Sequence, residues 1–406
     1  MNGIKKHYPT VGKLINLYIN AKNIVESVMF KSEIKEFYNK NKAYCAYPFK
    51  EIYNDNSGHY KLCCYSNVHP NTRKYTTQNT TPFKYFRSKE MEEIRNKMLA
   101  GEKMSSCKVC YQMEEASGES YRTKDIQKIS GIELEPASIG LKLRVHGSKC
   151  NLQCYMCWPH NSSGRRNEIK AVYGKEELKK WMPQFKSINY TQWNDILKDI
   201  LDNIHLVNYI VFTGGEPLQL PKQWEMVEKI PEEHAKHITL AYDTNLTELT
   251  YKDHSIFDVA KKFQKVELKA SCDHYGRKLE WIRYPINRKR FESNLIEAID
   301  LIPYINCAPS ILNIYDLDKI YDYYKQHFGL RTQFTSIVRG PKMLSMRNIN
   351  DKKSLLKKYE KLEWFNYIKS ELALPIYDKD NIKMKKYCDD LSKHRNFNWR
   401  ELWNEF

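Results

Sequence analysis

Residues 141–157, LKLRVHGSKCNLQCYMC, contain the pattern from which the rest of the chain is interpreted. The first residues alternate apolar and polar side chains, as a strand does, and Gly147 ends that pattern. Three cysteines follow, Cys150, Cys154 and Cys157, separated by three and then two residues. A structural zinc site or a closed four-iron cluster takes four protein ligands. Three thiolates leave one metal position open, which indicates a site that also binds a non-protein ligand.

A second motif follows at the end of the next predicted strand. The apolar run 207–212 leads into ThrGlyGlyGluPro at 213–217. Glycines at the end of a strand let the backbone approach a ligand closely, and Glu216 adds a carboxylate there. On its own this motif is more often a turn than a site. Its position one strand after the cysteines makes a shared ligand site the stronger interpretation.

The cysteine spacing, with Asn151 after the first cysteine and Met156 before the last, resembles the cluster motif of the radical S-adenosylmethionine (SAM) enzymes. Gly214, Gly215 and Glu216 resemble the GGE motif of the same superfamily. The resemblance implies that Cys150, Cys154 and Cys157 hold a [4Fe-4S] cluster whose fourth iron binds SAM, and that the GGE motif contacts the methionyl amino group. It also implies reductive cleavage of SAM to a 5′-deoxyadenosyl radical, with an electron donor such as flavodoxin or ferredoxin. The alternatives at this motif are a zinc knuckle or three free thiols.

The alternation of strand-like and helix-like segments after the motif predicts an α/β fold with a mainly parallel sheet. Further strands are expected at 238–242, 266–270, 305–312 and 333–338. Six such units suit an open, partial (β/α)6 TIM-like barrel, similar to the radical SAM core, with ligands at the C-terminal ends of its strands. The fourth strand ends in Ser271-Cys-Asp273, which resembles a cofactor-binding Ser-x-Asp ending in related enzymes. Ser271, Asp273 and Arg283 are therefore expected to bind SAM, against ordinary turn and surface roles.

A second group of cysteines precedes the central motif. Cys45 and Cys63 form the first pair, and the turn-forming residues 54–58 between them predict a hairpin. Cys107 and Cys110 form the second pair, a Cys-x-x-Cys motif that follows a helix-like stretch at 91–99. Four thiolates complete a site that either iron-sulfur or zinc chemistry accepts. Cys64 is adjacent to Cys63 and is an alternative ligand.

The order of Cys45, Gly58, Cys63 and the Cys107–Cys110 pair is similar to the Twitch segment, a shortened relative of the SPASM domain. The resemblance implies an auxiliary iron-sulfur cluster, which relays electrons if all four of its ligands come from the protein. Twitch segments usually follow the radical domain. In this chain the Twitch-like region precedes the domain, and this departure leaves the orientation of the region open.

Composition limits the remaining choices. The chain has 406 residues, with 66 Lys and Arg against 49 Asp and Glu, and this excess favours acidic partners or reflects biased base composition. The grouped cysteines, together with the lack of a signal peptide or membrane-spanning segment, predict a cytoplasmic, metal-binding protein. The three cysteines outside the two groups, Cys272, Cys307 and Cys388, are expected to be buried structural thiols. The expected division is a helical segment 1–42, a Twitch-like region 43–130, a radical SAM core 138–345 and a helical tail 346–406. Trp399 and Trp403 in the tail are expected to pack against the core.

The sequence thus predicts a radical SAM enzyme that abstracts hydrogen from a substrate, with a peptide or protein as the first expectation. Modification of RNA or a nucleotide is the alternative, favoured by a basic stretch after the cluster motif that comprises Arg165, Arg166, Lys170, Lys175, Lys179 and Lys180. A third reading is a non-enzymatic, zinc-stabilised interaction module, which would bind zinc without iron.

Overall fold

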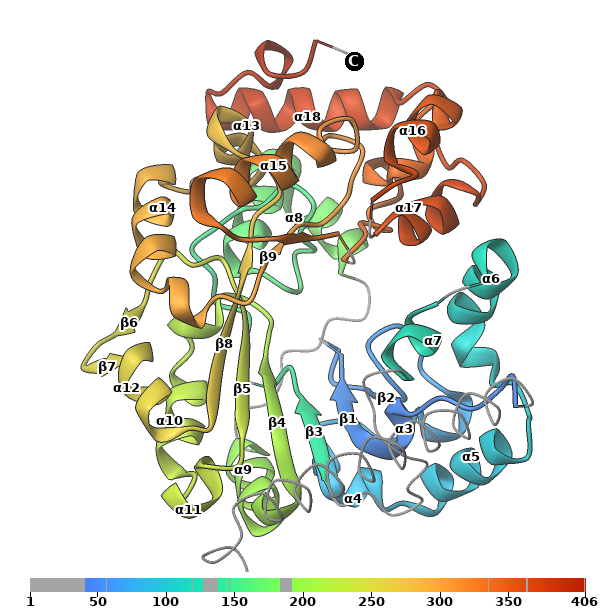
Figure 1. The fold of residues 1–406 in the computed structure, drawn as a ribbon, viewed down its shortest axis with the longest axis vertical. Helices are drawn as coiled ribbons and strands as arrows, with labels where there is room; N and C mark the ends of the chain where they lie inside the picture. The colour runs from blue at the N-terminus through green and yellow to red at the C-terminus, as the bar shows by residue number, and fades with distance from the viewer. Residues whose placement is uncertain are drawn as a thin grey trace, which may run out of the picture.

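The protein is built around one eight-stranded sheet, seen in a computed structural model (Figure 1). The strand order is β10-β9-β8-β5-β4-β3-β1-β2, and every neighbouring pair is parallel except β1 and β2. The structure describes residues 41–55, 57–118, 120–126, 138–145, 147–182, 192–334, 336–362, 364–404 and 406. Residues 1–40 of the helical segment expected at 1–42 lie outside these ranges. An open, mostly parallel sheet flanked by helices confirms the α/β fold class and is consistent with a partial TIM-like barrel; it does not close into a barrel over the described strands.

The central strands are those that the sequence predicted. They are β3 (Ile139–Lys142), β4 (Val207–Phe212), β5 (Thr239–Thr244) and β8 (Lys265–Ser271). Alternate residues of each strand are buried in the core on the outer face of the sheet, for example Leu141, Ile210, Leu240 and Leu268. A two-residue period of burial marks β3 and β8, whereas β4 and β5 contain consecutive buried residues and are found in the sequence as apolar runs.

Two predicted strands are much shorter in the structure. β9 covers only Ile305–Asn306 and β10 only Thr332–Gln333, instead of 305–312 and 333–338. After β9 the chain reaches Pro309, which has no N–H to donate to a ladder. Asn313 then holds a turn, because its Oδ1 accepts from Ser310 N at 2.8 Å and its Nδ2 donates to Ala308 O at 3.1 Å. The apolar residues after β9 therefore form a buried loop and not a longer strand.

The N-terminal cysteine region joins the same sheet. β1 (Glu51–Asn54) pairs in parallel with β3 and forms an antiparallel hairpin with β2 (Tyr60–Lys61), which confirms the predicted hairpin. The helix predicted at 91–99 is α5 (Lys89–Leu99), which begins where Ser88 Oγ accepts from Met91 N. The other helices of this region are α3 (Tyr47–Lys50), α4 (Pro82–Phe86), α6 (Lys108–Ser117) and α7 (Tyr121–Ile126).

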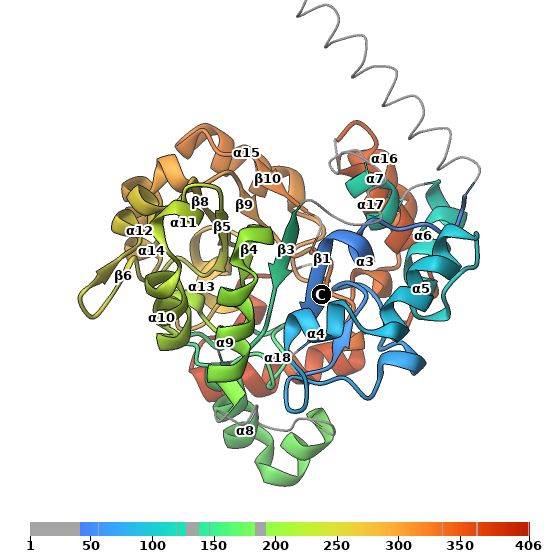
Figure 2. The same cartoon turned by 90° about the horizontal axis from the view of Figure 1, so that it is seen from below.

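Helices connect the strands and cover the outer face of the sheet (Figures 1 and 2). α9 shows why they form, since its buried Trp193, Ile196, Leu197 and Ile200 recur at helical spacing. The connecting helices are α8 (Ser163–Trp181), α9 (Trp193–Asp202), α10 (Pro221–Lys229), α11 (Glu232–Ala235), α12 (Ile256–Lys262), α13 (Gly276–Ile282), α14 (Arg288–Glu297) and α15 (Leu317–Phe328). A two-stranded hairpin of β6 (Thr250–Tyr251) and β7 (His254–Ser255) precedes α12.

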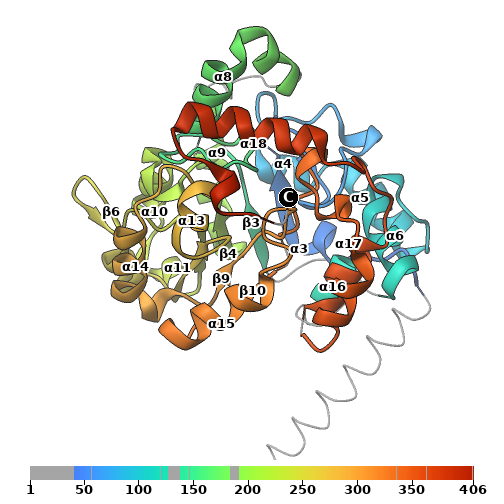
Figure 3. The same ribbon diagram turned by 90° about the horizontal axis from the view of Figure 1, so that it is seen from above.

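The tail folds back over the C-terminal ends of the strands. It comprises α16 (Lys352–Tyr359), α17 (Phe365–Leu372) and α18 (Ile382–Arg395), and α18 lies across this end of the molecule beside α8 (Figure 3). Trp399 and Trp403 are buried, as predicted, and Trp403 Nε1 donates to Leu312 O. No helix among the described residues is long and apolar enough to cross a membrane.

Candidate metal and cofactor sites

The loop that carries the three central cysteines runs from the end of β3 to the start of α8. Backbone hydrogen bonds tie its middle to the segment after α13: Gln153 N donates to Tyr284 O at 2.6 Å, and Tyr155 N donates to Ile282 O at 3.0 Å. At the start of α8, a Cβ on Gly164 would lie 2.6 Å from Leu152 O, so only glycine lets the helix approach the loop this closely. We call residues 150–157 the cluster loop.

The three thiols of the cluster loop are close enough to influence one another. Burial, and then Cys154, raise the pKa of both Cys150 and Cys157, the latter to about 12. Hydrogen-bond donors face the sulfur atoms: Leu152 N is 3.5 Å and Asn245 Nδ2 is 3.9 Å from Cys150 Sγ, and Arg283 Nη1 is 3.9 Å from Cys154 Sγ. Thiols this close repel one another when each is ionised alone, whereas a shared metal centre removes that repulsion. This donor set fits an iron-sulfur cluster.

The GGE motif packs on the backbone that flanks the cluster loop. Gly215 N donates to Asn161 O and Glu216 N donates to Lys149 O, both at 2.8 Å. Gly215 has a φ of +59°, and a Cβ there would lie 2.2 Å from Lys149 O. The two motifs predicted to share a ligand are therefore in backbone contact.

The Glu216 side chain is buried and turns toward β5. Its carboxylate accepts hydrogen bonds from Thr244 Oγ1 at 2.6 Å, Asn245 N at 2.7 Å and Leu218 N at 3.2 Å. Burial raises its pKa to about 7, although these donors act in the opposite direction. In this arrangement Glu216 orients Asn245, and its contact with a methionyl amino group stays a prediction.

The residues predicted at the end of β8 reach the cluster loop through an ion pair. Asp273 is fully buried, and its Oδ2 lies 2.8 Å from Arg283 Nε, while its Oδ1 accepts from Ala308 N at 2.7 Å. Arg283 thereby joins Asp273 to Cys154. Ser271, the last residue of β8, is half-buried on the opposite face of the sheet from Ala270. Their binding of SAM stays a prediction, and Asp273 is placed to orient Arg283.

Asn245 is a site residue that sequence reasoning did not select. Its Nδ2 donates to Asn151 Oδ1 at 2.9 Å, and Asn151 Nδ2 donates to Thr247 Oγ1 at 2.8 Å. This chain of amides links the end of β5 to the cluster loop. Its position at the C-terminal end of a predicted parallel strand was the available signal.

The four upstream cysteines converge on one small pocket. Cys45, Cys63, Cys107 and Cys110 line it together with Tyr47, Tyr65, Ser66, Tyr121 and Arg122. Cys64 is not among the lining residues; burial raises the pKa of its thiol, and Lys142 acts in the opposite direction. The geometry thus favours Cys63 over Cys64 as the fourth ligand. That these four cysteines bind a metal, and which metal, stays a prediction.

Within the described ranges, no three His, Cys, Asp or Glu side chains lie close enough together to hold a single metal ion. A four-iron cluster distributes its thiolate ligands around a cube, which is a different geometric requirement from that of one ion. The three remaining cysteines, Cys272, Cys307 and Cys388, are buried, as predicted.

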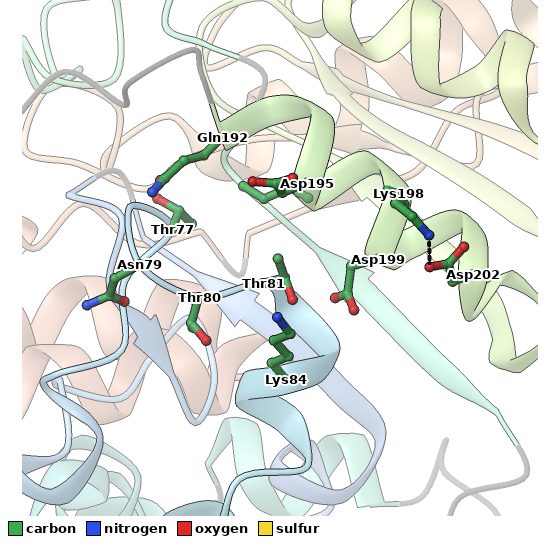
Figure 4. A pocket seen from close by; sticks show the side chains of 11 residues that line it. Thr77, Asn79, Thr80, Thr81, Lys84, Gln192, Asp195, Lys198, Asp199 and Asp202 are labelled. Atoms are coloured by element: carbon green, nitrogen blue, oxygen red, sulfur yellow. Dashed lines mark hydrogen bonds and ion pairs between the residues drawn. The ribbon is translucent and has the colours of Figure 1, made fainter.

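A separate polar hollow lies between α4 and α9 (Figure 4). Thr77, Thr81 and Gln192 line it beside the acidic side of α9, where Lys198 pairs with Asp202 at 2.6 Å. It contains none of the predicted site residues, and we assign no ligand to it.

Comparison with known proteins identifies the central region. Residues 145–315 match the Radical SAM superfamily, so the chain contains a radical SAM superfamily domain that includes the cluster loop and the GGE motif. No curated protein matches the chain. Similar solved structures include "Native anSMEcpe with bound AdoMet" (21% identity, TM-score 0.35, covering 50% of this chain and 52% of that one) and "Native anSMEcpe with bound AdoMet and Cp18Cys peptide" (20% identity, TM-score 0.34, covering 49% and 50%). The chain thus spans about half the length of these solved proteins.

Proposed function

We propose that this protein is a radical SAM enzyme in which Cys150, Cys154 and Cys157 hold a [4Fe-4S] cluster and SAM binds beside the GGE motif. The observation that carries the proposal is the backbone contact between the two motifs within a radical SAM domain. When bound, the cluster and SAM supply a one-electron cleavage that produces a hydrogen-abstracting radical.

The side chains around the site have roles that support this chemistry. Leu152 N, Asn245 and Arg283 direct donors at the thiolates and so favour their charged, metal-binding form. Asp273 fixes Arg283, and Glu216 fixes Asn245, so both side-chain donors are oriented by a buried carboxylate. The three cysteines of the cluster loop are half-buried, so bound cofactor and substrate would complete the exclusion of water from the place where a radical would form.

The four upstream cysteines are proposed to hold an auxiliary cluster. Their convergence on one enclosed pocket supports four protein ligands, an arrangement that leaves no iron free for substrate. Arg122 lies against this pocket, where its positive charge lowers the pKa of Cys45 and Cys107 against the effect of burial. Electron relay is the role that such a closed cluster can perform.

The substrate is proposed to be a peptide or protein. The inner face of the sheet, opposite the apolar core face, carries three half-buried cations and three half-buried anions: Lys142, Arg144, Lys269, Glu51, Asp243 and Glu267. Balanced charge suits a peptide, which has donors, acceptors and side chains of both signs. A groove for nucleic acid requires an excess of cations.

The basic stretch after the cluster loop gives little support to the RNA alternative. Arg165 is buried against Glu168, and Lys179 and Lys180 pair with Glu176 and Glu177. Half of the basic residues of this stretch are thus ion-paired within the same helix.

The test is SAM cleavage by the full chain after anaerobic reconstitution with iron and sulfide. With dithionite as reductant, the wild type should form 5′-deoxyadenosine, and Ala at Cys150, Cys154 or Cys157 should abolish it. Cys388→Ala, at a buried thiol outside both cysteine groups, is the matched control and should retain cleavage. Cleavage that persists in the three cluster-loop variants would refute the assignment. A colourless protein that binds zinc alone would establish the interaction-module alternative.

A further inference from the structure

The C-terminal helix α18 contacts the cluster loop on both sides of Cys154. Arg395 Nη2 donates to Gln153 O at 2.6 Å, and Tyr387 Oη donates to Tyr155 O at 2.7 Å. The N–H groups of the same two loop residues are held by Tyr284 O and Ile282 O. Gln153 and Tyr155, the residues on either side of Cys154, therefore have both their N–H and their C=O groups held, and each C=O is held by a helix more than 200 residues away.

The same helix completes a buried group of charges. Arg395 Nε lies 2.6 Å from Glu168 Oε1, and Arg165 forms an ion pair with Glu168 Oε2 and a hydrogen bond with Tyr387 Oη. The side chains of Arg165, Glu168 and Arg395 are fully buried. Arginine stays protonated under these conditions, so two cations and one anion leave a net charge of +1 in the interior.

An uncompensated buried charge is costly, which indicates that an anion belongs nearby. Arg165 Nε is buried and has no hydrogen-bond partner among the described residues. Both arginines lie against the segment that carries Cys154: Arg395 donates to Gln153 O, and Arg165 donates to the Tyr387 hydroxyl that holds Tyr155 O. Three thiolates on an iron-sulfur core supply a net negative charge at this place.

We propose that α18 is a positioning element of the three-cysteine site, in which Arg395 and Tyr387 fix the Cys154 segment and the Arg165–Glu168–Arg395 group holds a positive charge beside the cluster. The inference rests on the proposed function, because it requires the cluster. It has two separable consequences, one for how firmly iron is held and one for how readily the cluster accepts an electron from a reductant.

The charge is tested by Glu168→Gln, which keeps the shape and removes the anion. The added net positive charge should favour the reduced state of the cluster. At the wild-type midpoint potential, the ratio of reduced to oxidised cluster should be about tenfold higher, which is the order of magnitude expected for one charge acting through the protein interior. The measurement is a redox titration followed by electron paramagnetic resonance, using the signal that changes when SAM is added. Lys386→Gln, on the exposed side of α18, is the control and should leave the midpoint unchanged.

The positioning is tested by Arg395→Lys, which keeps the charge but loses the forked contacts, and by Tyr387→Phe, which loses one hydroxyl. Each should release iron to a chelator about ten times faster than the wild type, the usual scale for groups that orient metal ligands. Circular dichroism should show a retained fold.

These outcomes separate the two proposals. A wild type without a SAM-responsive signal overturns the proposed function itself. A responsive wild type, with an unchanged midpoint in Glu168→Gln or unchanged iron release in both positioning variants, overturns only the role of α18. If Glu168→Gln does not fold, iron release from the other two variants decides.

Discussion

Substitution of Gly215 by Ala should damage the site more than its one added methyl group suggests. Gly215 has a φ of +59°, which costs an L-residue roughly 1–2 kcal/mol. Its Cβ would also lie 2.2 Å from Lys149 O and 2.9 Å from Ser148 C, both backbone atoms of the segment that enters the cluster loop. Relief of that overlap should cost about a further 1–3 kcal/mol. Gly215→Ala should therefore lower the free energy of unfolding by roughly 2–5 kcal/mol.

Gly276→Ala separates the two contributions. Gly276 has the same φ of +59°, and no atom lies within 4 Å of the place its Cβ would occupy. This control should lose only the conformational part, roughly 1–2 kcal/mol. Urea unfolding of the apoproteins measures both variants, and iron uptake on reconstitution reports whether the cluster loop has moved. Equal losses in the two variants, with equal iron uptake, would refute the claim that backbone contact between the motifs builds the site.

Three other predictions concern individual side chains. Cys63→Ser should remove the iron that is bound upstream while Cys64→Ser keeps it, as measured by iron per chain; loss in both variants alike would contradict the ligand choice. Burial raises the pKa of Glu216 to about 7, above its unfolded value, so the folded apoprotein binds more protons than the unfolded chain between about pH 5 and pH 7. Its free energy of unfolding should fall as pH rises through that window, and Glu216→Gln should flatten this slope in urea titrations; an unchanged slope argues against a buried carboxylate. Lys142→Met should slow substrate modification about tenfold or more while SAM cleavage continues, because Lys142 lies on the inner face and not on the cluster loop. Equal loss of both activities would place Lys142 in the SAM site instead.

The parts of the fold that could be predicted are those with a local pattern. β8 buries every second side chain, and β4 and β5 are short apolar runs with consecutive buried residues; both patterns are visible in the sequence. The short β9 and β10 could not be predicted, because an apolar run has the same appearance in a strand and in a buried loop. Asn313, which holds the loop after β9 through side-chain hydrogen bonds, gives no periodic signal.

The same distinction applies to the site. The cysteine spacing and the GGE motif are each contiguous, so their residues could be named from the sequence. The contact of Arg395 with Gln153 joins residues 242 apart, and that of Arg395 with Glu168 joins residues 227 apart. A buried arginine in a charged helix has no local signature, since the sequence gives no sign that its partner is far away.

The two cysteine sites are connected by the sheet itself. β1 lies between Cys45 and Cys63 of the upstream group, and it pairs in parallel with β3, which leads into the cluster loop; Ile52 is opposite Leu141 in this register. Because strands in one sheet keep a fixed spacing and register, the pairing makes the separation of the two sites a property of the fold. The position of the proposed auxiliary site relative to the cluster loop is therefore set by strand pairing and not by order along the chain. The electron relay that we propose for the upstream site would depend on this fixed separation.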